Sequence, residues 1–341
     1  MIKLRAYFVG AVVLAAGLSV LASDVKTKKN DTNLAETGIK EVDTVERIQK
    51  KPVGFELLTG VSYWAGDVTY DIGGRAWDNS NNRWYNVEDP ISELVFPLDV
   101  VAVNIEASLT VIEMFEVYAG ADVAVTDPDS KVEDSDWQYG QKVIYSESDS
   151  KLDAWSVDAG LRYWAYVQAF RAPGISIGAA PGIGYMKQNM EWSVRNLDQW
   201  YPTRPDRPHD IVSGEVMTYD YEMDMIYISA NTFVCNRLFR GDLSAGYSIY
   251  MKTKAVDDHV LRYKKSTSDF DGNAFFVEAE GRFYFTEPVF LFLKAAYMRF
   301  ESDGMQEQEF YAGENAGWRA KVDSEITSDQ ITGVIGVGFE I

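Results

Sequence analysis

The feature that most constrains this chain is the alternation of apolar residues with small or polar ones along many of its segments. In 174–185 three of the six odd positions are isoleucine, with a tyrosine, an alanine and a proline, and the even positions are glycine, alanine and serine. The same period of two recurs in 242–252 and in 273–285. This period indicates β-strands, and an apolar face indicates that another sheet or lipid covers it.

About ten such segments follow one another, and their connections alternate between short and long. The predicted strands cover approximately 55–73, 91–110, 113–126, 150–166, 174–190, 219–234, 238–254, 271–286, 288–301 and 325–341. Short connections are Val111-Ile112, Arg171-Ala172-Pro173, Asn236-Arg237 and Glu287-Pro288. Long, polar connections cover roughly 74–90, 127–149, 191–218, 255–270 and 302–324. Short turns on one side and long loops on the other are typical of bacterial outer-membrane barrels.

Residues 53–341 are therefore predicted to form an all-β, antiparallel transmembrane β-barrel with long outer loops and short periplasmic turns. A soluble sandwich of two sheets is the alternative, but the asymmetry of the connections favours the barrel, which also leaves no unpaired strand edge in lipid. Aromatic clusters are expected to form girdles at the membrane interfaces. They comprise Tyr63-Trp64, Trp155, Tyr163-Trp164-Tyr166, Tyr284 and Tyr297.

The segment before the barrel has two parts. Lys3 and Arg5 precede an apolar run and a small-residue exit at Val20-Leu21-Ala22, which predicts a signal peptide over 1–22. A membrane helix is the alternative, but the run is short for a span. Residues 23–52 are polar, charged and free of aromatics, which predicts a flexible periplasmic tail.

Composition narrows the classes of partner. The formal charge of −20 disfavours nucleic acid and favours cationic partners, including cationic peptide substrates. The single cysteine, Cys235, excludes an internal disulfide framework. The sequence suggests no cofactor and no metal cluster.

Two motifs in the long connections could carry chemistry. Asp134 and Asp136 lie in Asp134-Ser135-Asp136-Trp137, within the second long connection, and Asp257 and His259 begin the fourth. If these connections meet, His259 could act as a general base near neutral pH, oriented by Asp257. Asp134 and Asp136 would hold a water opposite it. Two close carboxylates raise each other's proton affinity, so one could carry a proton and donate it to a substrate carbonyl.

With these motifs the chain resembles the omptin family of outer-membrane endoproteases, from about Phe55 to Ile341. Omptins are ten-stranded barrels with an Asp-x-Asp pair before a tryptophan in the second outer loop and an Asp-x-His pair in the fourth. The run Tyr221-Glu222-Met223-Asp224-Met225-Ile226 adds to the likeness. The resemblance implies a monomer in outer-membrane lipid that hydrolyses peptide bonds with water, at a site facing outside. It also implies that lipopolysaccharide is required.

Two features depart from the family pattern. Omptins select basic residues with acids in the specificity pocket, and one of these positions is Ala255 here, while the other falls near Tyr70 or Asp71. In addition, strict alternation continued from Ile249 would aim Asp257 and His259 away from the barrel interior. A β-bulge or a loop departure is therefore expected above the membrane, because bulges occur beside active sites.

Two alternatives stay open. A non-enzymatic barrel, either a porin or an adhesin, could keep this frame without the activity. The inward charges Glu278, Glu280 and Arg282 fit either a polar interior or a narrow pore. A rival cluster at 204–210 contains His209 and Asp210, which could bind a metal or a partner, although the proline spacing favours a stiff surface loop.

Overall fold

The computed structural model describes residues 53–341 except 79–80, 113, 171–173 and 287. The predicted signal peptide and tail lie outside the described residues. One antiparallel sheet contains fourteen strands. They are β1 (Val53–Asp78), β2 (Arg83–Asn86), β3 (Ser92–Pro97), β4 (Val100–Val111), β5 (Phe115–Ala124), β6 (Val132–Gln138), β7 (Gln141–Tyr163), β8 (Tyr166–Phe170), β9 (Ile175–Trp200), β10 (Asp210–Cys235), β11 (Phe239–His259), β12 (Lys264–Tyr284), β13 (Val289–Phe310) and β14 (Arg319–Glu340), with a 3₁₀ turn η1 (Val260–Arg262).

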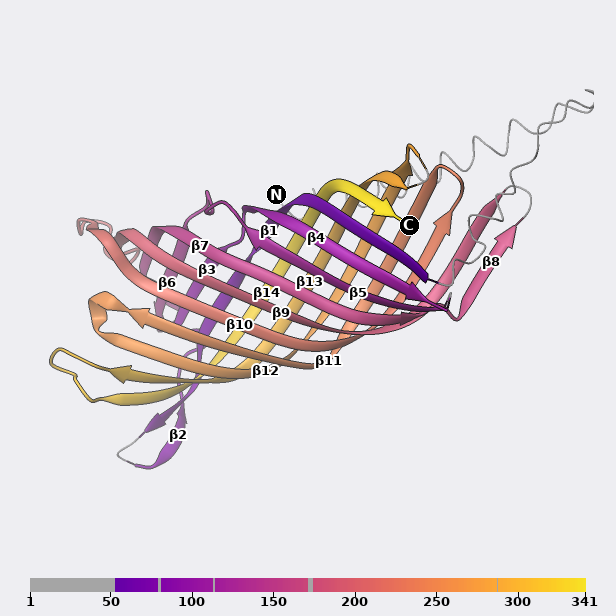
Figure 1. Ribbon diagram of the computed structural model, residues 1–341. Coiled ribbons are helices and arrows are strands. Elements are labelled where there is room, and N and C mark those ends of the chain that lie inside the picture. The colour runs from indigo at the N-terminus through magenta and orange to yellow at the C-terminus, as the bar shows by residue number, and fades with distance from the viewer. Residues whose placement is uncertain (1–52, 79–80, 113, 171–173, 287) are drawn as a thin grey trace, which may run out of the picture.

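Ten of these strands close into a ring, which confirms the predicted barrel. The order is β1-β4-β5-β7-β9-β10-β11-β12-β13-β14, and β14 pairs back onto β1 from Glu56 opposite Glu340 upward. The short strands β3 and β6 continue the wall above β4 and β5, where β3 pairs with β1 and β6 with β7. Figure 1 shows the tilted wall, with β2 and β8 at opposite ends. The end that carries β2, β6 and η1 is called the mouth below.

The predicted alternation builds the wall. On β11 the outward side chains Leu243, Tyr247 and Ile249 are exposed and apolar, whereas three of the four outward side chains from Lys252 to Asp258 are charged, the exception being Val256. An apolar band thus surrounds the lower barrel, and the strands extend past this band to form the mouth. Among the described residues, no helix has the length and apolar character needed to cross a membrane.

The long connections prove to be mostly strand, so their prediction as loops was wrong. The connection at 191–218 shrinks to 201–209, that at 302–324 to 311–318, and that at 255–270 to 260–263. The connection at 127–149 contains β6 and the start of β7. Beyond the apolar band the outward side chains are mainly polar, although the hydrogen-bonded ladder continues.

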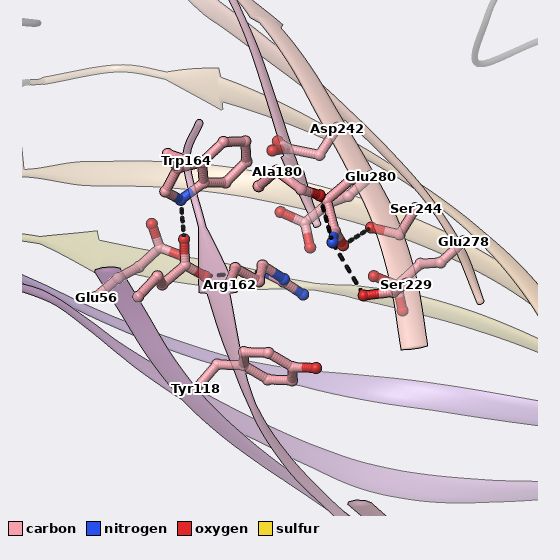
Figure 2. A network of polar contacts seen from close by, with 12 residues as sticks. Glu56, Tyr118, Arg162, Trp164, Ala180, Ser229, Asp242, Ser244, Glu278 and Glu280 are labelled. Atoms are coloured by element: carbon pink, nitrogen blue, oxygen red, sulfur yellow. Dashed lines mark hydrogen bonds and ion pairs between the residues drawn. The ribbon is translucent and has the colours of Figure 1, made fainter. Parts of the chain in front are cut away.

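Part of the predicted aromatic girdle was also wrong. Tyr63, Tyr163 and Tyr166 point outward and are exposed, but Trp64, Trp164 and Tyr284 are buried. Adjacent residues of a strand face opposite sides of the sheet. Each of the pairs Tyr63-Trp64 and Tyr163-Trp164 can therefore place only one of its two rings on the outer face. The indole Nε1 of Trp164 instead donates to Glu116 Oε2 at 2.8 Å inside the barrel (Figure 2).

The lower interior holds a network of ion pairs. The guanidinium of Arg282 contacts Glu56 at 2.6 Å and also contacts Glu280, which confirms the predicted inward direction of Glu280 and Arg282. Arg162 pairs with Glu116 at 2.8 Å (Figure 2). Lys294 pairs with Glu106.

A hydrogen-bonded group lies beside these ion pairs. Asn231 joins Ala180, Ser229 and Ser244 through hydrogen bonds of 2.9–3.1 Å (Figure 2). A polar cavity of about 280 Å³ lies within this network.

Above the cavity, aromatic and methionine side chains fill the interior. Phe96 stacks on Tyr219 with ring centroids 4.3 Å apart, and Trp192, Tyr70 and Phe270 pack around them. These side chains belong to one large buried core that also includes methionines from β9, β10 and β11. The core therefore lies inside the barrel, directly beneath the mouth.

Candidate functional site

A β-bulge in β11 sets the direction of the Asp-x-His motif. Tyr250 pairs with Ile226 and Ser248 pairs with Tyr227, so Ile249 is an extra residue without a partner in β10. Below the bulge the even positions face inward, and above it the odd positions do, including Ala255 and Asp257. The expected departure from alternation is confirmed, and it lies within the apolar band rather than above it.

Asp257 and His259 form a close pair on the inner face of the mouth. Asp257 Oδ2 lies 3.1 Å from His259 Nε2, and the two side chains are only 1% and 12% exposed. Asp257 lies opposite Tyr219 of β10 and Ser266 of β12 in the ladder. The hydroxyls of both neighbours are buried without a hydrogen-bond partner, so the carboxylate lies among polar groups with unused hydrogen-bonding capacity.

Asp134 and Asp136 lie on strand β6 rather than in a loop, which corrects the sequence prediction. Asp134 lies opposite Leu94 of β3, whose side chain is buried in the core, so Asp134 also faces inward. Its Oδ1 atom is buried and has no hydrogen-bond partner. Pairing of β6 with β3 and β7 fixes the two carboxylates on a rigid part of the wall.

The two motifs meet across the mouth. Arg262 of η1 places its guanidinium 3.5 Å from Asp136 Oδ2, and the charges of His259, Arg262 and Lys264 act on Asp134. All four residues singled out in the sequence are therefore gathered in one place, although more than 100 positions separate the motifs.

Arg262 and Lys264 are components of this place that the sequence analysis missed. Lys264 opens β12 opposite His259, and its side chain is buried. Tyr263 between them adopts a left-handed conformation with φ of 51°. Its carbonyl accepts a hydrogen bond of 2.9 Å from the backbone of Tyr311, which braces the turn against the neighbouring hairpin. The only sequence signal was the spacing Arg-x-Lys directly after the Asp-x-His motif.

The charges at the mouth shift one another's proton affinity. Burial, and then the neighbouring Asp136, raises the pKa of Asp134 to about 6, although His259, Arg262 and Lys264 act in the opposite direction. Burial alone would raise the pKa of Asp257, but His259, Lys264 and Arg262 hold it below its ordinary value. Burial lowers the pKa of Lys264. Asp257 is thus kept ionised, while Asp134 can gain or lose a proton near neutral pH.

The positions expected to carry specificity acids are neutral or face away. Ala255 is buried and lies opposite Ser268 in the ladder. Tyr70 also points inward, and its hydroxyl lies 2.9 Å from Ser268 Oγ. Asp71 lies on the opposite face of the strand, near Glu93 and Glu325. The wall beneath Asp257 therefore holds hydroxyls and aromatic rings.

The rival cluster between β9 and β10 is internally bonded. His209 Nδ1 lies 2.8 Å from Asp198 Oδ1, and its ring stacks on Trp200. Asp210 pairs instead with Arg207 at 3.1 Å. In the part of the chain that the structure describes, no three His, Cys, Asp or Glu side chains are grouped to hold a metal ion. These contacts agree with a stiff surface loop.

Two cavities lie away from the four residues. The lumen cavity of about 280 Å³ lies below the aromatic core. A second hollow of about 430 Å³ lies at the rim of β1, β13 and β14, where it is lined mainly by acids and glycines. The candidate site is thus a shallow cluster at the mouth rather than either of these cavities.

Comparison with known proteins identifies the family. The family model "Omptin family" matches residues 74–341. Among solved structures, the outer membrane protease OmpT from Escherichia coli superposes with a TM-score of 0.70 at 14% identity, over 86% of this chain and 100% of that one. The outer membrane protein OprG from Pseudomonas aeruginosa gives only 0.37 at 9% identity, over 86% and 98%. No curated protein sequence matches the chain. The family match covers most of the barrel, and the chain belongs to the omptin family.

Proposed function

We propose that this protein is an outer-membrane endopeptidase that activates water between the Asp134–Asp136 pair and the Asp257–His259 pair. The observation that carries the proposal is the convergence of both pairs at the mouth, with 3.1 Å between His259 and Asp257 and Arg262 bridging to Asp136. The Escherichia coli protein with the same fold, OmpT, is an outer membrane protease.

In this proposal His259 is the general base. Its Nε2 atom faces Asp257, so its Nδ1 atom is the nitrogen available to take a proton from water. Asp257 is held ionised, and it would orient the ring and stabilise the imidazolium that forms as water attacks the peptide carbonyl. The proton taken by His259 would later pass to the leaving amine.

The opposite wall would position the water. Asp134, with its raised pKa, is the carboxyl that would bind the water and exchange a proton with it. Asp136 lies 3.5 Å from the guanidinium of Arg262, which holds its carboxylate in place beside Asp134. Neither a serine nor a cysteine nucleophile takes part in this scheme.

The setting in the cell is part of the proposal. The apolar band would lie in outer-membrane lipid, and the mouth would face outside, so that a monomer meets peptide or protein substrates there. A requirement for lipopolysaccharide is expected from the family alone. The acidic exterior would raise the local concentration of cationic polypeptides.

The test is cleavage of a mixed peptide library by refolded protein, with and without lipopolysaccharide, beside His259→Ala and Asp134→Ala. Loss of cleavage in both folded variants supports the proposal. A folded wild-type barrel that cleaves nothing in either condition contradicts it.

The second candidate is a non-enzymatic barrel, and the polar lumen cavity is the observation that favours it. The aromatic core between that cavity and the mouth is an obstacle to ion flow. Conductance in a planar bilayer, together with an absence of cleavage, would support a pore.

A further inference from the structure

Among the charged residues of the candidate site, Arg262 is the most exposed. The side chain of Arg262 is 46% exposed, whereas that of Asp136 is 22% exposed. His259 and Asp257 are more buried than either, and Lys264 is buried as well. A substrate side chain that enters beside His259 therefore meets the guanidinium of Arg262 first.

The position of Arg262 is fixed by its turn. Tyr263 follows in the left-handed conformation, and its backbone N–H donates to Val260 at 3.3 Å. On the other side, Tyr311 bonds to the Tyr263 carbonyl, and its hydroxyl donates to Asp258 at 3.0 Å. A guanidinium carries five N–H donors, so contact with Asp136 leaves donors free for a second carboxylate.

A basic substrate side chain finds no exposed, unpaired carboxylate within the candidate site. Asp136 already contacts Arg262, Asp257 already contacts His259, and the unpartnered oxygen of Asp134 is buried. Ala255 and Tyr70, at the inward positions below, carry no charge. A lysine or arginine next to the scissile bond would have to approach Arg262 and Lys264, which disfavours it.

We propose that Arg262 is a specificity-determining residue that selects aspartate or glutamate beside the scissile bond. This inference rests on the proposed endopeptidase function and adds its substrate class. The overall negative charge of the molecule acts at longer range, and salt screens exposed charges beyond about 8–10 Å. Cationic polypeptides can thus be attracted to the surface while cleavage occurs next to their acidic residues.

The test uses fluorogenic peptides that differ only in one residue flanking the cut bond, namely Glu, Gln or Lys. Wild-type protein should show kcat/KM in the order Glu, Gln, Lys, with about 10- to 100-fold between Glu and Gln, as expected for one charge-assisted hydrogen bond. Arg262→Gln should abolish the difference, Arg262→Lys should keep part of it, and Arg262→Glu should reverse the order. Lys265→Glu is the matched control, because Lys265 lies on the same turn but is exposed on the other face.

The outcomes distinguish failure of the proposed role of Arg262 from failure of the proposed peptidase function. Wild-type cleavage that prefers Lys, or an order unchanged in Arg262→Gln, overturns the role of Arg262 while the peptidase function stands. Cleavage of no peptide by folded wild-type protein contradicts the peptidase function itself. If Arg262→Glu does not fold, as judged by far-UV circular dichroism in detergent, the wild-type order and the Gln and Lys variants still decide the question.

Discussion

The lower interior and the mouth of this barrel differ in how their buried carboxylates are paired. In the lower interior Arg282, Arg162 and Lys294 each contact a carboxylate, and the atoms buried there without a hydrogen-bond partner include Arg162 Nε and Asn104 Oδ1. At the mouth, by contrast, a carboxylate oxygen itself, Oδ1 of Asp134, is buried without a hydrogen-bond partner. A buried acceptor without a donor costs free energy, and a charged one costs more than a neutral one. The carboxylates thus distinguish the ion-paired interior from the candidate site.

Deleting Val256 should have the largest effect, and it should act only at the mouth. Val256 lies between the bulge and the Asp257–His259 pair, so the loss of one residue there turns both side chains outward. We expect peptidase activity to fall by about 10²- to 10⁴-fold, the contribution of general acid–base catalysis. Val256→Ala, which keeps the length of the strand, is the control. Activity retained in the deletion variant would show that the pair does not act from the inner face.

The pH profile should show that Asp134 acts in its charged form. Its pKa of about 6 predicts that kcat/KM falls roughly tenfold per pH unit below about pH 6, with no such limb in Asp134→Asn. The folded-state pKa lies above the ordinary value of 3.8, so protonation of Asp134 favours the folded state, and its contribution to stability rises as pH falls from about 6 to about 4. Activity and stability should therefore move in opposite directions. A limb near pH 6 that persists in Asp134→Asn would assign it to another group.

Arg282→Leu should damage the lower interior without affecting the mouth. The substitution leaves Glu56 without its ion-pair partner and Glu280 with only Lys294 at 3.8 Å, and breaking such a buried pair costs about 3–5 kcal/mol. Denaturant unfolding in detergent should report this loss, while kcat/KM per folded molecule stays unchanged. Arg282→Lys should lose less because it keeps the charge. A large fall in activity of the folded variant would mean that the two regions are coupled.

Arg299→Gln should have the smallest effect. Arg299 and Asp329 are 3.5 Å apart on the outer wall, and both are about half exposed, so solvent screens their attraction. We expect the free energy of unfolding to change by less than about 0.5 kcal/mol, with no change in activity. A loss comparable to that of Arg282→Leu would show that charged pairs outside the barrel also stabilise the wall.

The sequence was most informative where one face of the chain meets an apolar environment. Alternation in segments such as 242–252 predicts the wall because one-sided burial leaves a period of two. It also revealed the conflict at Ile249 that the bulge resolves. The outer ends of β9 and β10, at 195–200 and 210–215, could not be predicted, because hydrogen-bonded strands with two exposed faces leave no hydrophobic pattern.

At the mouth, the sequence predicted the acids and the histidine but not the cations. Asp134, Asp136, Asp257 and His259 belong to two motifs that recur in a family, whereas Arg262 and Lys264 belong to neither. Their approach to Asp136 depends on the left-handed Tyr263 and on the hairpin that braces it. Contacts made through a turn of this kind depend on distant strands, which local patterns do not encode.

The closure of the ring also governs how the chain matures. The first strand of the wall pairs with the last, so that Leu58 lies opposite Gly338 across 280 positions of sequence. Until β14 has been synthesised and exported, β1 offers a free edge to any extended polypeptide, and such edges promote aggregation. Pairing of segments so far apart in sequence is also slow. The incomplete chain therefore carries unpaired edges until the last strand arrives, and a ribosome that stops early releases a molecule prone to misassembly.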